Sequence, residues 1–260
     1  MGAAVRESGA MPAVTAVVQG QPSVGISDET LERFLAGGAP KVSVRDIGWA
    51  MAGRLDGATT VAAALAIASA AGIDVFATGG IGGVHRGGTH DESADLLELS
   101  RANVVTVCAG AKSILDLPAT VERLESYGVA VVGYRTDKFP GFFTARTGIP
   151  LSAVADTATE IARAFLAAQS LGRAAAMLVV QAPPAHAALY ADVVEAAVDT
   201  ALREATLAGI RGSAVTPFLL AAVERATGGA SVRANLALLE ANARLGGQIA
   251  AAIAAERVRD

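Results

Sequence analysis

One lysine stands where a strand-like run gives way to small residues. The apolar run at 104–108 is followed by Ala-Gly-Ala and then by Lys112. We expect a helix over 113–127, which would place the Lys112 ammonium at the positive end of the helix dipole and depress its pKa. A lysine with a depressed pKa can act as a nucleophile and form a Schiff base. An ion pair with Asp116, four residues further on, would explain the same lysine without any catalysis.

A glycine-rich segment follows the strand predicted at 75–77. Six of the ten residues in 79–88 are glycine, and His85 and Arg86 lie among them. Such a run lets the backbone approach a ligand and present N–H groups to an anion, and the two cationic side chains suit a phosphate. The spacing matches neither the Rossmann fingerprint nor the Walker A loop. A flexible loop without a ligand is the alternative.

An acidic cluster follows the glycines. If Ser93 opens a helix over 93–100, Asp91 and Asp95 lie four residues apart near its first turn and can point to one side. Clustered carboxylates suit Mg²⁺ or Mn²⁺. Acidic residues at a helix start also interact favourably with the helix dipole, and on spacing alone this simpler interpretation is preferred.

Two weaker patterns have both a structural and a functional interpretation. Lys41, Arg45 and Asp46 form a short charged segment, which is either a phosphate anchor or a surface salt-bridge cluster. Asn235 and Asn242 are seven residues apart on one face of the last predicted helix, where asparagine is a poor helix former. Their amides would hydrogen-bond either within the core or to a ligand.

Composition excludes several classes of protein. Of 260 residues, 52% are hydrophobic and 18% charged, so the chain has ample apolar surface to fold. A net charge of −4 gives no electrostatic case for binding nucleic acid. No apolar stretch is long enough to span a membrane, and residues 1–9 lack a signal-peptide core. The single cysteine, Cys108, excludes an internal disulfide, and we expect a cytoplasmic protein.

Apolar runs alternate with longer Ala- and Leu-rich stretches. This rhythm predicts an α/β fold with helices on both faces of a central, mostly parallel sheet, as a single domain over 1–260. The predicted strands cover 13–18, 75–77, 104–108, 129–134 and 176–180. The predicted helices cover 59–71, 93–100, 113–127, 155–171, 193–208, 217–226 and 232–257. We expect Thr216 and Ser231 to cap the last two helices.

Taken together, the segments FATGGIGGVHRG, SADL, CAGAKSILD, TPF and ASVRANLALLEANA resemble the pseudouridine-5′-phosphate glycosidase family, also called indigoidine synthase A-like proteins. The resemblance extends from about residue 9 to the last helix. It implies an α/β/α fold, a homotrimer, and Mn²⁺ or another divalent metal. The implied activity is reversible cleavage of the C–C glycosidic bond of pseudouridine 5′-phosphate to uracil and ribose 5-phosphate.

The resemblance also implies roles for particular residues. Lys112 matches the lysine that forms a covalent imine-type adduct with C1′ of the ring-opened sugar, and Asp95 matches the metal-binding aspartate. The phosphate and sugar contacts fall on Lys41, Thr78, His85, Ser93 and Asn235.

The sequence departs from the family pattern in two places. The family has an N-terminal strand, with a motif like ALESTIIAHGMP, whose glutamate is thought to act as general acid and base. No such motif is present, and Glu7 belongs to the helix that follows that strand. The segment before SADL is about two residues shorter than usual, which could shift the metal site.

Three interpretations follow from this departure. The chain is an active glycosidase whose recorded start lies downstream of the true one. Alternatively it is a non-catalytic paralogue that binds phosphosugars, or an accessory enzyme that acts on another phosphorylated C-nucleoside.

Overall fold

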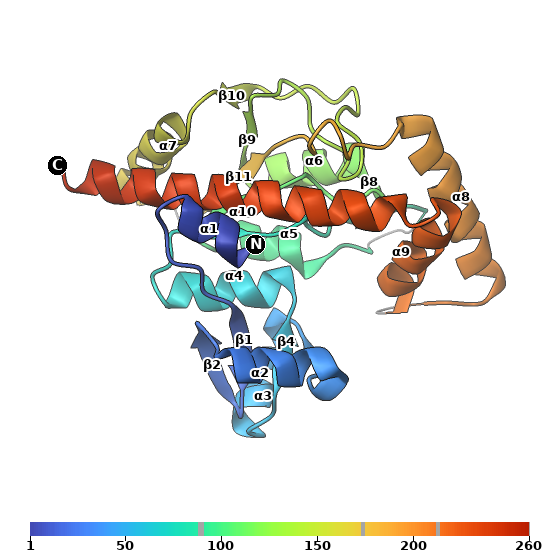
Figure 1. The fold of residues 1–260 in the computed structure, drawn as a ribbon, viewed down its shortest axis with the longest axis horizontal. Coiled ribbons are helices and arrows are strands. Elements are labelled where there is room, and N and C mark those ends of the chain that lie inside the picture. Colours follow the sequence, from blue (N-terminus) through green and yellow to red (C-terminus); the bar gives the residue numbers. More distant parts are fainter. Residues whose placement is uncertain (88–90, 173–174, 212–213, 260) are drawn as a thin grey trace.

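The computed structural model describes residues 1–87, 91–172, 175–211 and 214–259 (Figure 1). The strands are β1 Thr15–Val18, β2 Gln21–Val24, β3 Lys41–Val42, β4 Gly57–Thr59, β5 Val75–Ala77, β6 Val84–His85, β7 Val105–Cys108, β8 Leu115–Asp116, β9 Ala130–Tyr134, β10 Ala153–Ala155 and β11 Met177–Val180. The α-helices are α1 Gly2–Glu7, α2 Asp28–Arg33, α3 Ile47–Ala52, α4 Val61–Ala70, α5 Ala94–Leu99, α6 Leu117–Ser126, α7 Ala158–Ser170, α8 Ala191–Leu207, α9 Val215–Ala226 and α10 Ala230–Arg257. A π-helical segment, Phe34–Gly38, and a 3-10 turn, Val44–Asp46, complete the helical structure.

Five strands form the central sheet, in the order β10-β9-β11-β7-β5, and every pairing within it is parallel. Two of its inner strands, β7 and β11, are buried at every position. Nearly continuous apolar runs of this kind are typical of a parallel sheet covered on both faces. The predicted α/β fold with a central parallel sheet is therefore confirmed.

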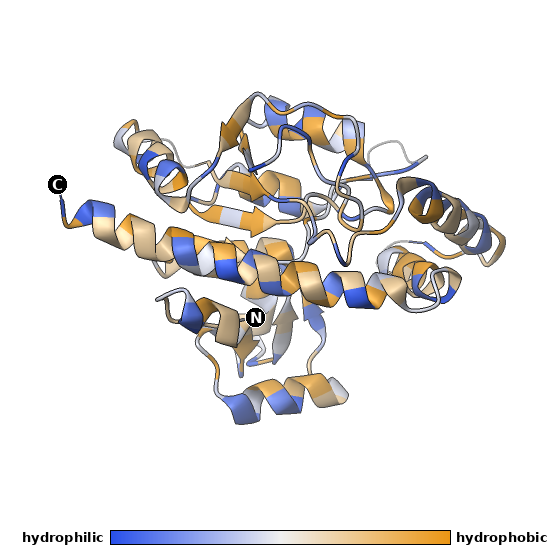
Figure 2. Cartoon of the chain, turned by 45° about the horizontal axis from the view of Figure 1, so that its top comes forward, coloured by the Kyte–Doolittle hydropathy of each residue, from blue (hydrophilic) through white to orange (hydrophobic). Residues whose placement is uncertain are grey.

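Helices cover both faces of this sheet, and Figure 2 shows the hydrophobic residues concentrated on the strands between them. On one face, Val107 and Val179 share a core cluster with Phe165 of α7 and Ile249 of α10. On the other face, Cys108 and its neighbours join a larger cluster that includes residues of α5, α6, α8 and α9. Because alternate strand residues point to opposite faces, a single apolar run supplies both layers of the core.

A second sheet lies beside the central one, in the order β2-β1-β4-β3 (Figure 1). The apolar run predicted at 13–18 belongs to this sheet and not to the central one, because β1 pairs antiparallel with both β2 and β4. Val17 and Val42 form a small separate core with Ile67 of α4. The edge strand of the second sheet, β3, carries Lys41, one of the residues that the resemblance assigns to the site.

The segment after Lys112 differs from the prediction. Instead of a helix over 113–127, β8 pairs antiparallel with β6, and α6 begins only at Leu117. Asp116 caps this helix, since its Oδ1 accepts the backbone N–H of Ala119 at 3.0 Å. The turn that carries Lys112 therefore leads into a small two-stranded sheet instead of a helix.

The starts of the last two helices also differ from those predicted. Helix α9 begins at Val215, so Thr216 lies in its first turn and does not cap it. Helix α10 begins directly after Gly229, whose φ of 76° only glycine adopts readily. Ser231 lies inside α10, where its Oγ is 3.1 Å from Thr227 Oγ1.

The longest helix of the described structure, α10, has 28 residues. That length would cross a bilayer, but charged side chains such as Arg233, Glu240 and Arg244 interrupt it. Within the described ranges no helix is both long and apolar enough to span a membrane.

Candidate active site

A cavity of about 890 Å³ opens beyond the carboxyl ends of β5 and β7. Every residue that the resemblance assigns to the site lines this cavity: Lys41 on β3, Thr78 after β5, His85 on β6, Ser93 and Asp95 at the start of α5, Lys112 after β7 and Asn235 on α10. Ligands of open parallel sheets bind at this edge, because the connecting turns and helix starts converge there. The fold thus brings residues from both ends of the chain to one place.

Lys112 sits in the tight turn between β7 and β8. Its backbone N–H donates to the carbonyl of Ile81 at 3.1 Å, which fixes the turn against the glycine-rich segment. Burial lowers the pKa of Lys112 from its ordinary value of 10.5; the charge of Asp95 opposes this shift and that of Lys41 reinforces it. The predicted direction is confirmed, but the predicted cause was wrong, because α6 begins five residues after Lys112 and its dipole is not the source.

The competing explanation for Lys112 was an ion pair with Asp116. Among the described residues, no ion pair joins Lys112 to Asp116. Asp116 instead caps α6. Lys112 therefore lines the cavity without an ion pair to Asp116, and burial lowers the pKa of its amine.

Asp95 is almost fully buried, with 5% of its surface exposed, and lies beside the cavity. Its Oδ1 accepts the N–H of Ala62 at 2.9 Å and its Oδ2 accepts that of Gly82 at 2.8 Å. Ser93 caps α5 as predicted, because its Oγ accepts the N–H of Asp95. Together these bonds fix the carboxylate at the cavity wall.

Asp91 does not join Asp95, contrary to the pairing that their spacing allowed. Asp91 precedes the helix cap, and its exposed carboxylate lies 3.8 Å from Nδ1 of His85. Among the described residues there is no cluster of three or more His, Cys, Asp or Glu side chains that could enclose a metal ion. Each oxygen of Asp95 keeps a lone pair beyond its N–H bond. This donor set suits a hard cation that retains most of its water, as Mg²⁺-type ions do.

The charged segment after Lys41 divides between two interpretations. Lys41 lines the cavity and is close enough to Lys112 to affect its pKa. Arg45 and Asp46 also line the cavity, but the side chain of Arg45 is 85% exposed and lies 3.5 Å from Asp46, as in a surface pair. The Asp46 carboxylate accepts the N–H of Ser43 and closes a 3-10 turn.

The two asparagines of α10 have different positions. Asn235 lines the cavity, whereas Asn242 is completely buried beneath it. Asn242 Nδ2 donates to the carbonyls of Thr78 at 2.8 Å and Gly79 at 3.3 Å. Its Oδ1 accepts Nε2 of Gln181 at 2.8 Å. Asn242 therefore makes the core hydrogen bonds that hold the turn after β5.

The glycines of the 79–88 segment make room for protein side chains. A Cβ at Gly80 would lie 2.6 Å from the ring of Phe142, and one at Gly82 would collide with Ser93. At Gly83 it would collide with Thr120. Gly88 lies outside the described residues, as do Thr89 and His90. Gly80, Gly82 and Gly83 thus make room for protein side chains, while Gly79, Gly80 and Gly82 also line the main cavity, so the predicted approach to a ligand stays a prediction.

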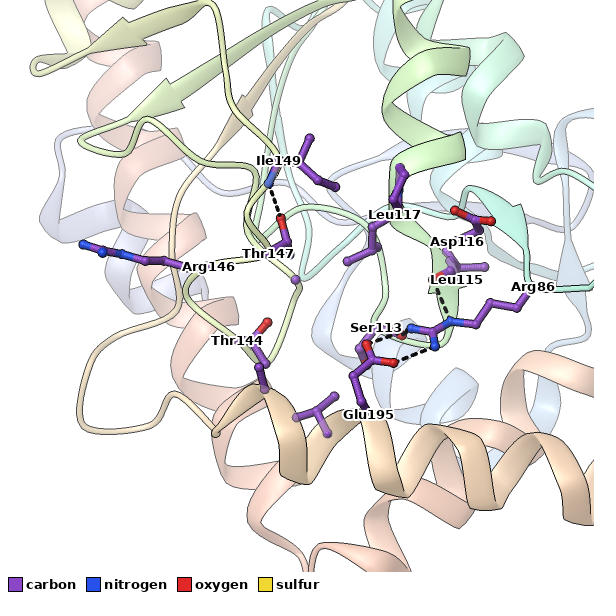
Figure 3. A pocket seen from close by; sticks show the side chains of 14 residues that line it. Arg86, Ser113, Leu115, Asp116, Leu117, Thr144, Arg146, Thr147, Ile149 and Glu195 are labelled. Carbon is purple, nitrogen blue, oxygen red and sulfur yellow. Dashed lines mark hydrogen bonds and ion pairs between the residues drawn. The ribbon is translucent and has the colours of Figure 1, made fainter.

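Arg86 points away from the cavity that His85 lines, so the two do not form one phosphate site. Its guanidinium pairs with Glu195 of α8 and lines a second cavity of about 460 Å³ (Figure 3). His85 is the last residue of β6 and Arg86 begins the turn that follows it, and their side chains line different cavities. The structure therefore does not bring Arg86 and His85 together at one phosphate site.

Further side chains line the main cavity without having been assigned to it, among them Thr60, Phe142 and Thr216. Thr60 could have been found from its place before an apolar helical run, because it caps α4. Phe142 has a φ of 66°, rare for a residue with a side chain, and nothing in its local sequence signals it.

Comparison with known proteins agrees with this arrangement. The sequence model of the family described as "Indigoidine synthase A like protein" matches residues 1–252. A pseudouridine-5′-phosphate glycosidase from Gemmatimonas aurantiaca is 61% identical over 251 residues, which cover 96% of this chain and 82% of that protein. One from Herpetosiphon aurantiacus is 53% identical over 254 residues, with coverage of 96% and 84%.

Solved structures show the same fold. The prealnumycin C-glycosynthase AlnA, in complex with ribulose 5-phosphate, superposes with a TM-score of 0.94 at 42% identity, covering 99% of this chain and 86% of that one. An indigoidine synthase A-like protein from Thermotoga maritima gives a TM-score of 0.89 at 36% identity, with coverage of 95% and 82%. The resemblance found in the sequence motifs is confirmed: the chain belongs to the family of indigoidine synthase A like proteins.

Proposed function

We propose that this chain reversibly cleaves the C–C glycosidic bond of pseudouridine 5′-phosphate and releases uracil and ribose 5-phosphate. Relatives at 61% and 53% identity carry the name of that activity. The observation that carries the proposal is Lys112, whose amine has a pKa lowered by burial and shares one cavity with Asp95 and Lys41.

A lysine suits this bond better than a pair of carboxylates does. Ordinary glycosidases protonate an oxygen leaving group, but C5 of uracil has no lone pair to protonate. In our proposal Lys112 Nζ attacks C1′ while O4′ leaves and takes up a proton, which opens the ring. The nitrogen lone pair then forms a C1′=N bond as the C1′–C5 bond breaks and C5 takes up a proton. Water adds to the imine carbon and releases ribose 5-phosphate and the free amine.

The remaining residues of the cavity would hold the phosphosugar. Lys41 supplies the positive charge for the phosphate, because ammonium groups bind phosphate through charge-assisted hydrogen bonds. We assign sugar and phosphate hydrogen bonds to Thr78, His85, Ser93 and Asn235, which line the same cavity.

We propose that Mn²⁺, or another divalent cation, is held by the carboxylate of Asp95 together with water. A bound cation would polarise the carbonyl groups of the uracil and so support the departure of C5. The support is the fixed, nearly buried carboxylate described above.

Assembly and location are proposed on weaker grounds. The family resemblance supports a homotrimer. A single cysteine, buried in the core, supports a reducing compartment such as the cytoplasm.

Two other functions are tested in the same assay. One is phosphosugar binding without turnover. The other is action on a different phosphorylated C-nucleoside, which the name of the C-glycosynthase that shares this fold favours. The purified chain is incubated with pseudouridine 5′-phosphate and Mn²⁺, and uracil is measured by liquid chromatography. A parallel sample receives ribose 5-phosphate and borohydride, and the reduced adduct is located by mass spectrometry.

We expect uracil release and an adduct on Lys112. Lys112→Ala should abolish both while leaving ribose 5-phosphate affinity nearly unchanged, and Lys138→Ala, at a lysine that does not line the cavity, should change neither. Binding of ribose 5-phosphate without any uracil release from the unaltered chain would favour one of the two alternatives. Uracil release by Lys112→Ala at the unaltered rate would remove Lys112 from the mechanism.

A further inference from the structure

The side chain of Arg86 binds two backbone carbonyls of the turn that carries Lys112. Within the turn, the carbonyl of Lys112 accepts the N–H of Leu115 at 3.0 Å. The carbonyls of Ser113 and Leu115 point outward and accept Nη2 and Nε of Arg86 at 3.0 and 3.1 Å. Ser113 and Leu115 are each only 2% exposed, so their carbonyls depend on a protein partner.

Arg86 is itself fixed by a carboxylate from a distant helix. The carboxylate of Glu195 on α8 accepts a hydrogen bond from Nη1 at 2.7 Å and one from Nη2 at 3.0 Å, and Figure 3 shows this pair beside Ser113 and Leu115. The guanidinium is planar and rigid, so fixing one edge with a carboxylate fixes the direction of its remaining N–H groups. Lysine could supply the charge at this position but not this fork of bonds.

The same short strand joins the two cavities. In β6, His85 pairs with Leu115 of β8 and lines the main cavity, whereas Arg86 follows it and lines the second one. Any movement of the Arg86 contacts would therefore shift the turn relative to His85 and Asp95, which line the same cavity as Lys112.

We propose that Arg86, held by Glu195, is a positioning residue for Lys112. It acts by fixing the turn at Ser113 and Leu115, without touching the substrate. This inference rests on the proposed role of Lys112 as nucleophile. Displacement of a reacting group by about 1 Å can lower a rate by about 100-fold. The Arg86–Glu195 pair, which we call the clamp, should therefore affect the chemical step more than substrate binding.

The kinetic constants separate this role from phosphate binding. If Arg86 positions Lys112, Arg86→Met should lower kcat for uracil release by about 10- to 100-fold with KM within about threefold. Arg86→Lys should recover only part of kcat, because it cannot bind both carbonyls and Glu195. Glu195→Gln should lower kcat less, and the double variant Arg86→Met with Glu195→Gln should be no slower than Arg86→Met alone.

Arg257→Met is the matched control. Arg257 makes a similar two-bond ion pair with Asp74, with N–O distances of 2.6 and 2.7 Å, and neither residue lines either cavity. It should leave kcat unchanged. Hydrogen–deuterium exchange of the holoenzyme gives a second readout that needs no substrate. Exchange at Lys112 and Leu115 should rise at least about tenfold in Arg86→Met, but not in Arg257→Met.

Unchanged kcat and unchanged exchange in Arg86→Met would overturn the proposal. So would a rise in KM at constant kcat, which would return Arg86 to a substrate-binding role. Faster exchange without a change in kcat would show a clamp that Lys112 does not need, and would also overturn it. If the unaltered chain releases no uracil, the proposed function fails but the positioning role can still be tested. The yield of the borohydride adduct at Lys112 is then compared between the variants in place of kcat.

Discussion

The Asp95 carboxylate accepts the N–H of Gly82 at 2.8 Å, and a Cβ at position 82 would lie 2.9 Å from that same oxygen. The glycine thus permits the contact that fixes Asp95. In Gly82→Ala the added methyl group would also collide with Ser93. We expect the Mn²⁺ concentration for half-maximal uracil release to rise at least about tenfold, and the free energy of unfolding to fall by about 1–3 kcal/mol.

Gly48→Ala is the control for this substitution. Gly48 lies in α3 with no atom within 4 Å of its added Cβ, and alanine there should stabilise the protein by about 0.5–1 kcal/mol without affecting the metal dependence. Equal Mn²⁺ requirements in Gly82→Ala and the unaltered chain would show that Gly82 does not position the carboxylate.

The sequence predicted the central sheet well because its signals are local. Mostly apolar runs such as 104–108 are long enough to identify buried parallel strands, and motif residues such as Asp95 and Lys112 were placed by resemblance. All of the residues so placed line one cavity. Strand order within the sheet carries no such local signal.

What the sequence could not give are the contacts made over long separations. Strand β8 replaces the first turn of a predicted helix only because β6 pairs with it. The destination of Arg86 depends on Glu195, which comes from a helix 109 positions further along the chain. The glycines of 79–88 likewise gave no sign of the side chains that pack against them. Those side chains, Ser93, Thr120 and Phe142, come from later parts of the chain.

Cys108 should be inert in the native protein. It is completely buried, and burial raises the pKa of its thiol to about 12. Because the thiolate is the reactive form, iodoacetamide at pH 8 should leave both the thiol and uracil release unchanged over hours. Mass spectrometry should find one alkylated cysteine only after denaturant is added. Rapid alkylation without denaturant would mean that the core around β7 opens readily.

Asn242 should matter for stability and for substrate binding together. Asn242→Leu would leave the carbonyl of Thr78 and the side-chain amide of Gln181 without this partner, whereas the carbonyl of Gly79 keeps the N–H of Ala109 at 2.9 Å. An unpaired buried polar group costs about 1–3 kcal/mol, so chemical denaturation should show a loss of at least that size. KM should rise too, because the turn carries Thr78 into the cavity. Gln248→Leu, at an exposed position of the same helix, should change neither quantity.

The pH dependence of catalysis should follow the charges around Lys112. The nucleophile is the neutral amine, so kcat should rise with pH through its pKa, which burial sets below 10.5. Lys41 lowers that pKa further, so Lys41→Met should move the rising limb to higher pH at fixed Mn²⁺ and saturating substrate. Lys138→Met, a lysine outside the cavity, should leave the limb in place. A limb that stays in place in Lys41→Met would assign it to another group.

The same shift has a consequence for stability. The folded pKa of Lys112 lies below its unfolded value of 10.5, so between the two the unfolded chain binds the extra proton. The free energy of unfolding should therefore rise with pH across that window, by 1.36 kcal/mol for each unit that separates the two values. Below the folded pKa the buried ammonium costs stability, and the contribution is no longer pH-dependent. Subtracting the pH profile of Lys112→Met from that of the unaltered chain isolates this rise, and a flat difference up to pH 10.5 would contradict the lowered pKa.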